Sequence, residues 1–228
     1  MALLIATPHA ASSEWFVDFY AREGLTERAD VTTNVRDLGL RTTVQDVKFD
    51  QGITFGGRAG YWLASAPVFG IGVDAFRFRP NISRQTRDTK VCSDSCVSSS
   101  AEFQDLDLSV IAASVDIMFR AAGMLESDDI PQGRLQPYIT IGPTVFIAEA
   151  KDSTNFGPPA DQSDTHVSVG FKVGGGFAWQ FHRHAALFAE YRFTYLRPRF
   201  EFTSSGLKTT VDTRLDTHHA VGGVSFRF

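Results

Sequence analysis

Eight segments of this chain alternate between apolar side chains and small or polar ones, and this pattern limits the fold more than any other feature. In the segment 167–181, for example, valine and phenylalanine alternate with serine, glycine and lysine. The other segments fall at 15–22, 53–63, 69–75, 109–120, 135–147, 187–195 and 221–228. Because successive side chains of a β-strand point to opposite faces, this sustained period of two predicts an all-β fold and excludes a helical one.

Composition and charge exclude two further classes of protein. The 228 residues contain no run of roughly 18 uncharged apolar residues, so a transmembrane helix is excluded. A formal net charge of -4 and a pI near 5.8 argue against a nucleic-acid partner, which would favour a basic surface. The mean hydropathy of -0.10 resembles that of a soluble protein, but a transmembrane barrel with a polar interior has a similar value.

The connections between the eight segments alternate in length. Four are long and polar and fall at about 25–50, 80–105, 148–165 and 198–217. The others are tight turns near 65–68 and 182–184 and a longer acidic turn near 127–132. Long loops at one end and short turns at the other are typical of outer-membrane barrels, whose long loops are extracellular. The sequence therefore predicts an eight-stranded antiparallel up-and-down transmembrane β-barrel with four extracellular loops.

The two faces of the strands differ in a way that indicates their orientation. Valine, isoleucine and phenylalanine dominate one face, while glycine and serine dominate the other with single charges of both signs. A lysine or arginine facing lipid at mid-depth would cost about 2–4 kcal/mol, so the charged face must line the lumen. The charges expected there, four acidic and four basic, are Asp18, Arg58, Asp74, Asp116, Lys172, Glu190, Arg192 and Arg227. Buried charges need partners, so we expect these residues to form a lumen charge network.

A soluble, ligand-binding barrel of the lipocalin type is the alternative architecture. Its apolar side chains would point inward and its polar side chains would face water. Such a barrel would have lysine- and glutamate-rich outer faces, whereas glycine and serine dominate the polar face here. The filled-lumen interpretation is therefore preferred.

The third segment changes phase near Ala75. Beyond this residue the apolar positions become Phe76 and Phe78, while Arg77 and Arg79 take over the apolar face. A β-bulge near Ala75 would restore the phase, and this is the preferred interpretation. Without a bulge both arginines would point outward, where they could pair with lipid phosphates.

The two cysteines and the first residues bear on the cellular compartment. Cys92 and Cys96 lie in a polar loop at a spacing that suits a disulfide formed in an oxidising compartment. Residues 1–12 are apolar and uncharged, so they are either the remnant of an export signal or an ordinary N-terminus. Residues 13–228 are expected to form a single barrel domain.

Several stretches resemble a known family, the small outer-membrane barrels of the opacity and OmpA-barrel type. They are residues 55–62 (FGGRAGYW), 136–142 (QPYITIG), 188–193 (FAEYRF) and the C-terminal VSFRF. The resemblance implies a bacterial outer-membrane location with periplasmic termini, and a signal at Phe226 and Phe228 for the outer-membrane assembly machinery. It implies a structural or surface-interaction role, with outer-membrane lipid and lipopolysaccharide as partners. No large pore, enzymatic activity, cofactor or metal is expected, and the sequence does not identify an extracellular ligand.

One enzymatic alternative rests on His166 and Ser168. Their H-x-S spacing resembles that of lipid A deacylases, in which a histidine base activates a serine nucleophile two residues away. Val169 stands where that family's motif has asparagine, and Gln180 where an orienting glutamate would be expected. Both departures weigh against this alternative.

Aromatic residues towards strand ends suit interfacial girdles: Trp15, Tyr61, Trp62, Trp179 and Tyr195.

Overall fold

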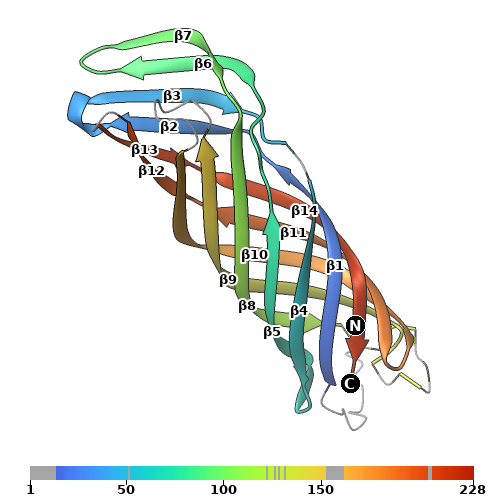
Figure 1. Cartoon of the computed structure of the whole chain (residues 1–228). Helices are drawn as coiled ribbons and strands as arrows, with labels where there is room; N and C mark the ends of the chain where they lie inside the picture. Colours follow the sequence, from blue (N-terminus) through green and yellow to red (C-terminus); the bar gives the residue numbers. More distant parts are fainter. Residues whose placement is uncertain are drawn as a thin grey trace, which may run out of the picture.

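The computed structural model describes residues 14–50, 52–121, 123–125, 127, 129–130, 132–152, 162–204 and 207–228. The expected remnant of an export signal at residues 1–12 lies outside them. Eight long strands form a closed barrel, and six shorter strands form a second sheet at one end of it (Figure 1). We call this second sheet the outer sheet. Within the described part of the chain, no helix has both the length and the apolar character needed to cross a membrane.

The barrel strands coincide with the eight alternating segments of the sequence. They are β1 (Glu14–Thr26), β4 (Ile53–Leu63), β5 (Ala66–Phe78), β8 (Leu106–Arg120), β9 (Leu135–Asp152), β10 (Gln162–His182), β11 (Ala185–Leu196) and β14 (Leu215–Arg227). Neighbours pair antiparallel in the order β1-β14-β11-β10-β9-β8-β5-β4, and β1 also pairs with β4, which closes the barrel. The prediction of an eight-stranded antiparallel barrel is confirmed.

Burial shows which face of the strands points inward. On the outer wall Val115 is 61% exposed and Val169 is 74% exposed, whereas Arg58 and Glu190 are 3% and 4% exposed inside the barrel. The apolar residues therefore face outward and the charged ones inward, as predicted. The alternative of a soluble barrel with an apolar interior is wrong. Trp62 is a correction to the expected aromatic girdle, because it is buried inside the barrel.

Strand β5 has no bulge near Ala75, so the preferred interpretation of its phase change is wrong. Its ladder with β4 runs without a shift from Trp62–Gly70 to Gly56–Phe76, and its ladder with β8 continues to Phe78. Phe76 and Phe78 are buried in the lumen, while Arg77 points outward and donates to Ser109 Oγ at 2.9 Å. The lumen accepts these two rings because Arg22 lies over Phe76, 3.9 Å from the ring centroid.

The outer sheet is formed by three of the four long polar connections, those at about 25–50, 80–105 and 198–217. Its strands are β2 (Ala29–Val35), β3 (Leu40–Val47), β6 (Gln85–Cys92), β7 (Cys96–Phe103), β12 (Arg199–Ser204) and β13 (Leu207–Thr213). They pair in the order β12-β13-β2-β3-β6-β7, and the short helix η1 (Arg36–Leu38) connects β2 to β3. Threonine and valine, which favour strands, are frequent here. One face of the sheet buries Val31, Val44, Phe200, Phe202 and Val211.

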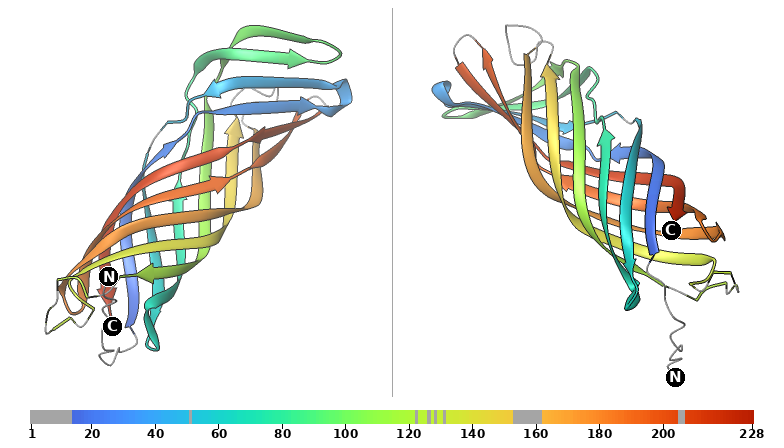
Figure 2. Two further views of the ribbon diagram at one scale, coloured as in Figure 1. Left: turned by 180° about the vertical axis from the view of Figure 1, so that it is seen from behind. Right: turned by 60° about the horizontal axis from the view of Figure 1, so that its bottom comes forward.

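The two ends of the barrel differ in what they carry: the C-terminus and the start of β1 at one end, and the outer sheet at the other. The C-terminus and the start of β1 lie at the end remote from the outer sheet (Figures 1 and 2). There Trp15 and Phe228 exchange two backbone hydrogen bonds of 3.2 and 2.9 Å. At the other end the β6–β7 hairpin projects beyond the barrel, and a disulfide between Cys92 and Cys96 joins its two strands. The predicted disulfide is confirmed.

Candidate functional site

The centre of the lumen is held by a lysine between two carboxylates. Lys172 of β10 places its Nζ 2.5 Å from Asp74 Oδ2 and 2.6 Å from Asp116 Oδ2. All three side chains are completely buried. The carboxylates come from β5 and β8, so this one cation connects three strands of the wall. An isolated ion would be costly at this depth, and its pairing offsets the desolvation.

Two arginines extend this cluster across the lumen. Arg192 of β11 contacts Asp74 at 3.0 Å and Glu190 at 2.7 Å. Arg58 of β4 then contacts Glu190 at 2.9 Å and Asp18 of β1 at 2.8 Å. The result is a continuous chain of alternating charge from Asp116 through Lys172, Asp74, Arg192, Glu190 and Arg58 to Asp18. Tyr20 adds to it by donating to Asp74 and accepting from Arg192.

A second cluster of ion pairs fills the lumen at the end of the barrel where β1 begins and β14 ends. Arg227, expected in the lumen charge network, pairs at 2.9 Å with Glu14, which was not among the expected residues, and Arg120 pairs with the other oxygen of Glu14 at 2.6 Å. The indole of Trp62 stacks on the Arg120 guanidinium at 4.3 Å. Sequence reasoning missed Glu14 because it precedes the first alternating segment. Its parity with Asp18 was the available signal, since both residues fall on the inward face of β1.

Towards the outer sheet the lumen contains a cation without a carboxylate. Among the described residues, Arg22 forms no ion pair; its Nε donates to Thr54 Oγ1 at 2.9 Å and its guanidinium stacks on Phe76 and Phe78. His219 lies close by and hydrogen-bonds Thr194 Oγ1 at 3.0 Å. Phe76, Phe78 and these polar groups fill the lumen at this level. The two rings take the place of a carboxylate for Arg22, because aromatic faces attract a guanidinium group.

Little space remains between these clusters. The cavity bounded by Phe16, Arg58, Trp62 and Tyr138 has a volume of about 10 Å³. A single water molecule needs roughly 10–15 Å³ of such volume, so this space holds at most one. The described side chains therefore leave no large pore through the barrel.

Comparison with known proteins identifies the family. A family model described as an outer membrane protein beta-barrel domain matches residues 1–228. The chain belongs to this family. It is a bacterial outer-membrane β-barrel protein, and the resemblance seen in its strand motifs is confirmed. A search of the curated proteins found no match.

Three solved structures of outer-membrane proteins are similar to this barrel at low sequence identity. The outer membrane protein OprG of Pseudomonas aeruginosa is 13% identical, with 96% of this chain and 97% of that chain covered and a TM-score of 0.63. Neisserial surface protein A is 16% identical, with 92% and 97% covered and a TM-score of 0.44. Ail of Yersinia pestis, in complex with the heparin analogue sucrose octasulfate, is 13% identical, with 94% and 99% covered and a TM-score of 0.42. The likeness to OprG shows the fold alone.

His166 and Ser168 are not hydrogen-bonded to each other in the described part of the chain. Ser168 Oγ is buried and makes no hydrogen bond within the described residues, with His166 or with any other group. Both residues lie on the inner side of β10, while Val167 between them and Val169 after them point to the outer wall. The described residues contain no group of three or more His, Cys, Asp or Glu side chains that could hold a metal ion.

Proposed function

We propose that this outer-membrane barrel conducts no large solutes and serves as a rigid support that presents the outer sheet for interactions at the cell surface. The observation that carries the proposal is the filled lumen, in which opposite charges pair from wall to wall between Asp116 and Asp18. The outer sheet supports it as well. Six hydrogen-bonded strands hold an extended surface in one conformation, as a binding platform requires.

The proposal places both termini in the periplasm and the outer sheet outside the cell. The tight turns between β4 and β5 and between β10 and β11 support this orientation, because outer-membrane barrels have short periplasmic turns and longer extracellular loops. Membrane lipid would surround the apolar outer wall. Lipopolysaccharide phosphates would meet the outward-facing Arg77 near the outer sheet, and the assembly machinery would recognise Phe226 and Phe228.

Two measurements test this function. Purified protein reconstituted in lipid vesicles should cause no swelling in sugar solutions, and sugar-dependent swelling would show that the lumen is open.

The orientation of the barrel in the membrane can be tested with Ser65→Cys in the β4–β5 turn and Ser99→Cys in β7, both of which replace exposed serines. A membrane-impermeant maleimide should label intact cells at position 99 but not at position 65. The reverse pattern would contradict the orientation.

The proposal assigns no catalytic role to Ser168. Lipid A from cells that express the wild-type protein should have the same mass spectrum as lipid A from cells that express Ser168→Ala. Loss of an acyl chain in the wild-type cells alone would instead establish the deacylase alternative.

A further inference from the structure

The outer sheet carries two adjoining hollows, with volumes of about 360 and 580 Å³. Arg199 and Asp212 line both of them, and we call the combined depression the arginine hollow. Ligand pockets typically have volumes of roughly 300–1,000 Å³, so each part is large enough for a small ligand. Five arginines line the depression: Arg36, Arg41, Arg197, Arg199 and Arg214.

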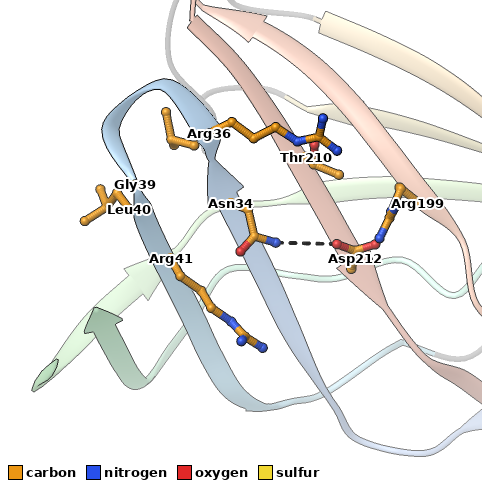
Figure 3. A pocket seen from close by; sticks show the side chains of 9 residues that line it. Asn34, Arg36, Gly39, Leu40, Arg41, Arg199, Thr210 and Asp212 are labelled. Atoms are coloured by element: carbon orange, nitrogen blue, oxygen red, sulfur yellow. Dashed lines mark hydrogen bonds and ion pairs between the residues drawn. The ribbon is translucent and has the colours of Figure 1, made fainter. Parts of the chain in front are cut away.

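The arginines come from two regions far apart in the sequence, residues 36–41 and residues 197–214. Arg36 begins η1, Arg41 belongs to β3 and Arg199 begins β12. The sheet register places Arg41 opposite Asn34, and Asn34 opposite Thr210, on one face. Figure 3 shows the guanidinium groups of Arg36, Arg41 and Arg199 arranged around Asn34. The fold thus gathers like charges that repel one another, which creates a local potential that attracts anions.

Part of this positive charge has no internal partner. Arg199 pairs with Asp212 at 2.6 Å, and Arg214 pairs with Asp216 at 2.9 Å. Among the described residues, Arg36 and Arg41 form no ion pair, and Arg197 only stacks on Tyr195. Three guanidinium groups therefore remain free to bind acidic groups of a ligand.

The remaining lining groups indicate what else the ligand carries. Asp212 accepts hydrogen bonds from Arg199 and from Asn34 Nδ2, the latter at 3.5 Å, which holds its carboxylate at the boundary between the two hollows. Donors and a fixed acceptor side by side suit a ligand with hydroxyl groups as well as acidic ones. The imidazole of His166 lines the second hollow, but no phenylalanine, tyrosine or tryptophan ring of the described residues lines either one, although single-stranded nucleic acids usually stack successive bases on aromatic rings.

We propose that the arginine hollow binds an anionic saccharide, with Arg36 and Arg41 on its phosphate, sulfate or carboxylate groups and Asp212 on a hydroxyl. This inference rests on the proposed function, because it gives the ligand class of the surface that the barrel presents. Two sources share this chemistry: the phosphorylated core of the cell's own lipopolysaccharide, and acidic glycans outside the cell.

Calorimetric titration of the purified, folded full-length protein in detergent tests the proposal. The probes are a delipidated, phosphorylated core oligosaccharide, the same oligosaccharide after dephosphorylation, a heparin hexasaccharide and a neutral dextran oligomer. We expect at least one of the two phosphorylated or sulfated probes to bind, the dephosphorylated core to bind more weakly than the phosphorylated one, and the neutral dextran to fail. Binding of the phosphorylated core alone would place the ligand on the bacterium's own surface, and binding of heparin would place it outside. Failure of both anionic probes would overturn the proposal.

A charge-matched pair of variants locates the site. A hydrogen bond to a charged group is worth about tenfold or more in affinity, so Arg36→Gln/Arg41→Gln, which removes two, should weaken binding by about a hundredfold or more. Arg28→Gln/Arg84→Gln removes the same charge from two exposed arginines outside the hollow and should leave affinity within about twofold, because distant surface charges are screened. Equal losses in both variants, or equally tight binding of duplex DNA, would overturn the proposal. Neither result depends on whether vesicles swell, so failure here is distinct from failure of the proposed function.

Discussion

Arg58 Nη1 lies 2.9 Å from Glu190 Oε2 inside the barrel and joins two strands that are not neighbours in the sheet. Arg58 belongs to β4 and Glu190 to β11, and β1 and β14 separate them in the wall. Glu190 also accepts from Arg192 at 2.7 Å and from Tyr138 at 2.8 Å. This carboxylate therefore satisfies two guanidinium groups, and its removal would leave both cations short of a partner.

Glu190→Gln should destabilise the barrel strongly. Removing one member of a buried ion pair leaves an uncompensated charge and typically costs about 3–5 kcal/mol. Urea unfolding of the protein in lipid vesicles measures the change. Glu201→Gln, at an exposed position of β12, is the matched control and should change stability by no more than about 0.5 kcal/mol. Equal effects of the two variants would show that the lumen network contributes little.

Val115→Arg tests whether the outer wall contacts lipid. Val115 in the barrel and Val97 in the outer sheet have similar exposed fractions, 61% and 64%. An arginine at mid-depth in the bilayer costs about 2–4 kcal/mol, whereas one in water costs little. Val115→Arg should therefore reduce the free energy of unfolding in vesicles by that amount, while Val97→Arg should not. Similar results for the two variants would contradict a membrane boundary between these positions.

Gly142→Ala should impair folding because the strands approach closely at this glycine. A Cβ atom there would lie 2.1 Å from the Val115 carbonyl oxygen, so the backbone of β8 would have to move. Overpacking of this kind costs about 1–3 kcal/mol. At Gly175 the nearest atom would be 3.7 Å away, an ordinary contact, so Gly175→Ala is the control. The temperature at which the heat-modifiable folded band disappears on gels should fall for Gly142→Ala alone.

Phe228→Ala should slow assembly in cells without much loss of stability. Phe228 is 71% exposed, and its contribution to pairing with Trp15 is through backbone atoms that alanine retains. We therefore expect less folded protein in the outer membrane but a similar unfolding curve for the purified, refolded protein. Leu187→Ala, on the outer wall of β11, is the control for loss of an exposed apolar side chain. Normal assembly of Phe228→Ala would remove the proposed signal.

The barrel was predictable because one local rule determines it. Side chains alternate along every strand, and a single charge such as Lys172 or Glu190 decides which face of its strand can point to lipid. The phase of β5 was harder to predict, because the pattern at Ala75 fits either a bulge or an outward Arg77. The register with β8 and the stacking of Arg22 on Phe76 decided this point, and both depend on strands distant in sequence.

The sequence by itself determined the eight barrel strands, which face of each strand points inward, the disulfide and the charges that must lie inside. Only the tertiary structure decided which charges pair, that the partner of Arg227 is Glu14, and that three of the four long polar connections form a sheet. The physical reason is that period-two patterning depends only on the environment of each face of one strand, which is lipid on the outside and the packed lumen on the inside. Ion pairs and the gathering of Arg36, Arg41 and Arg199 depend instead on the register between strands, to which distant parts of the chain contribute.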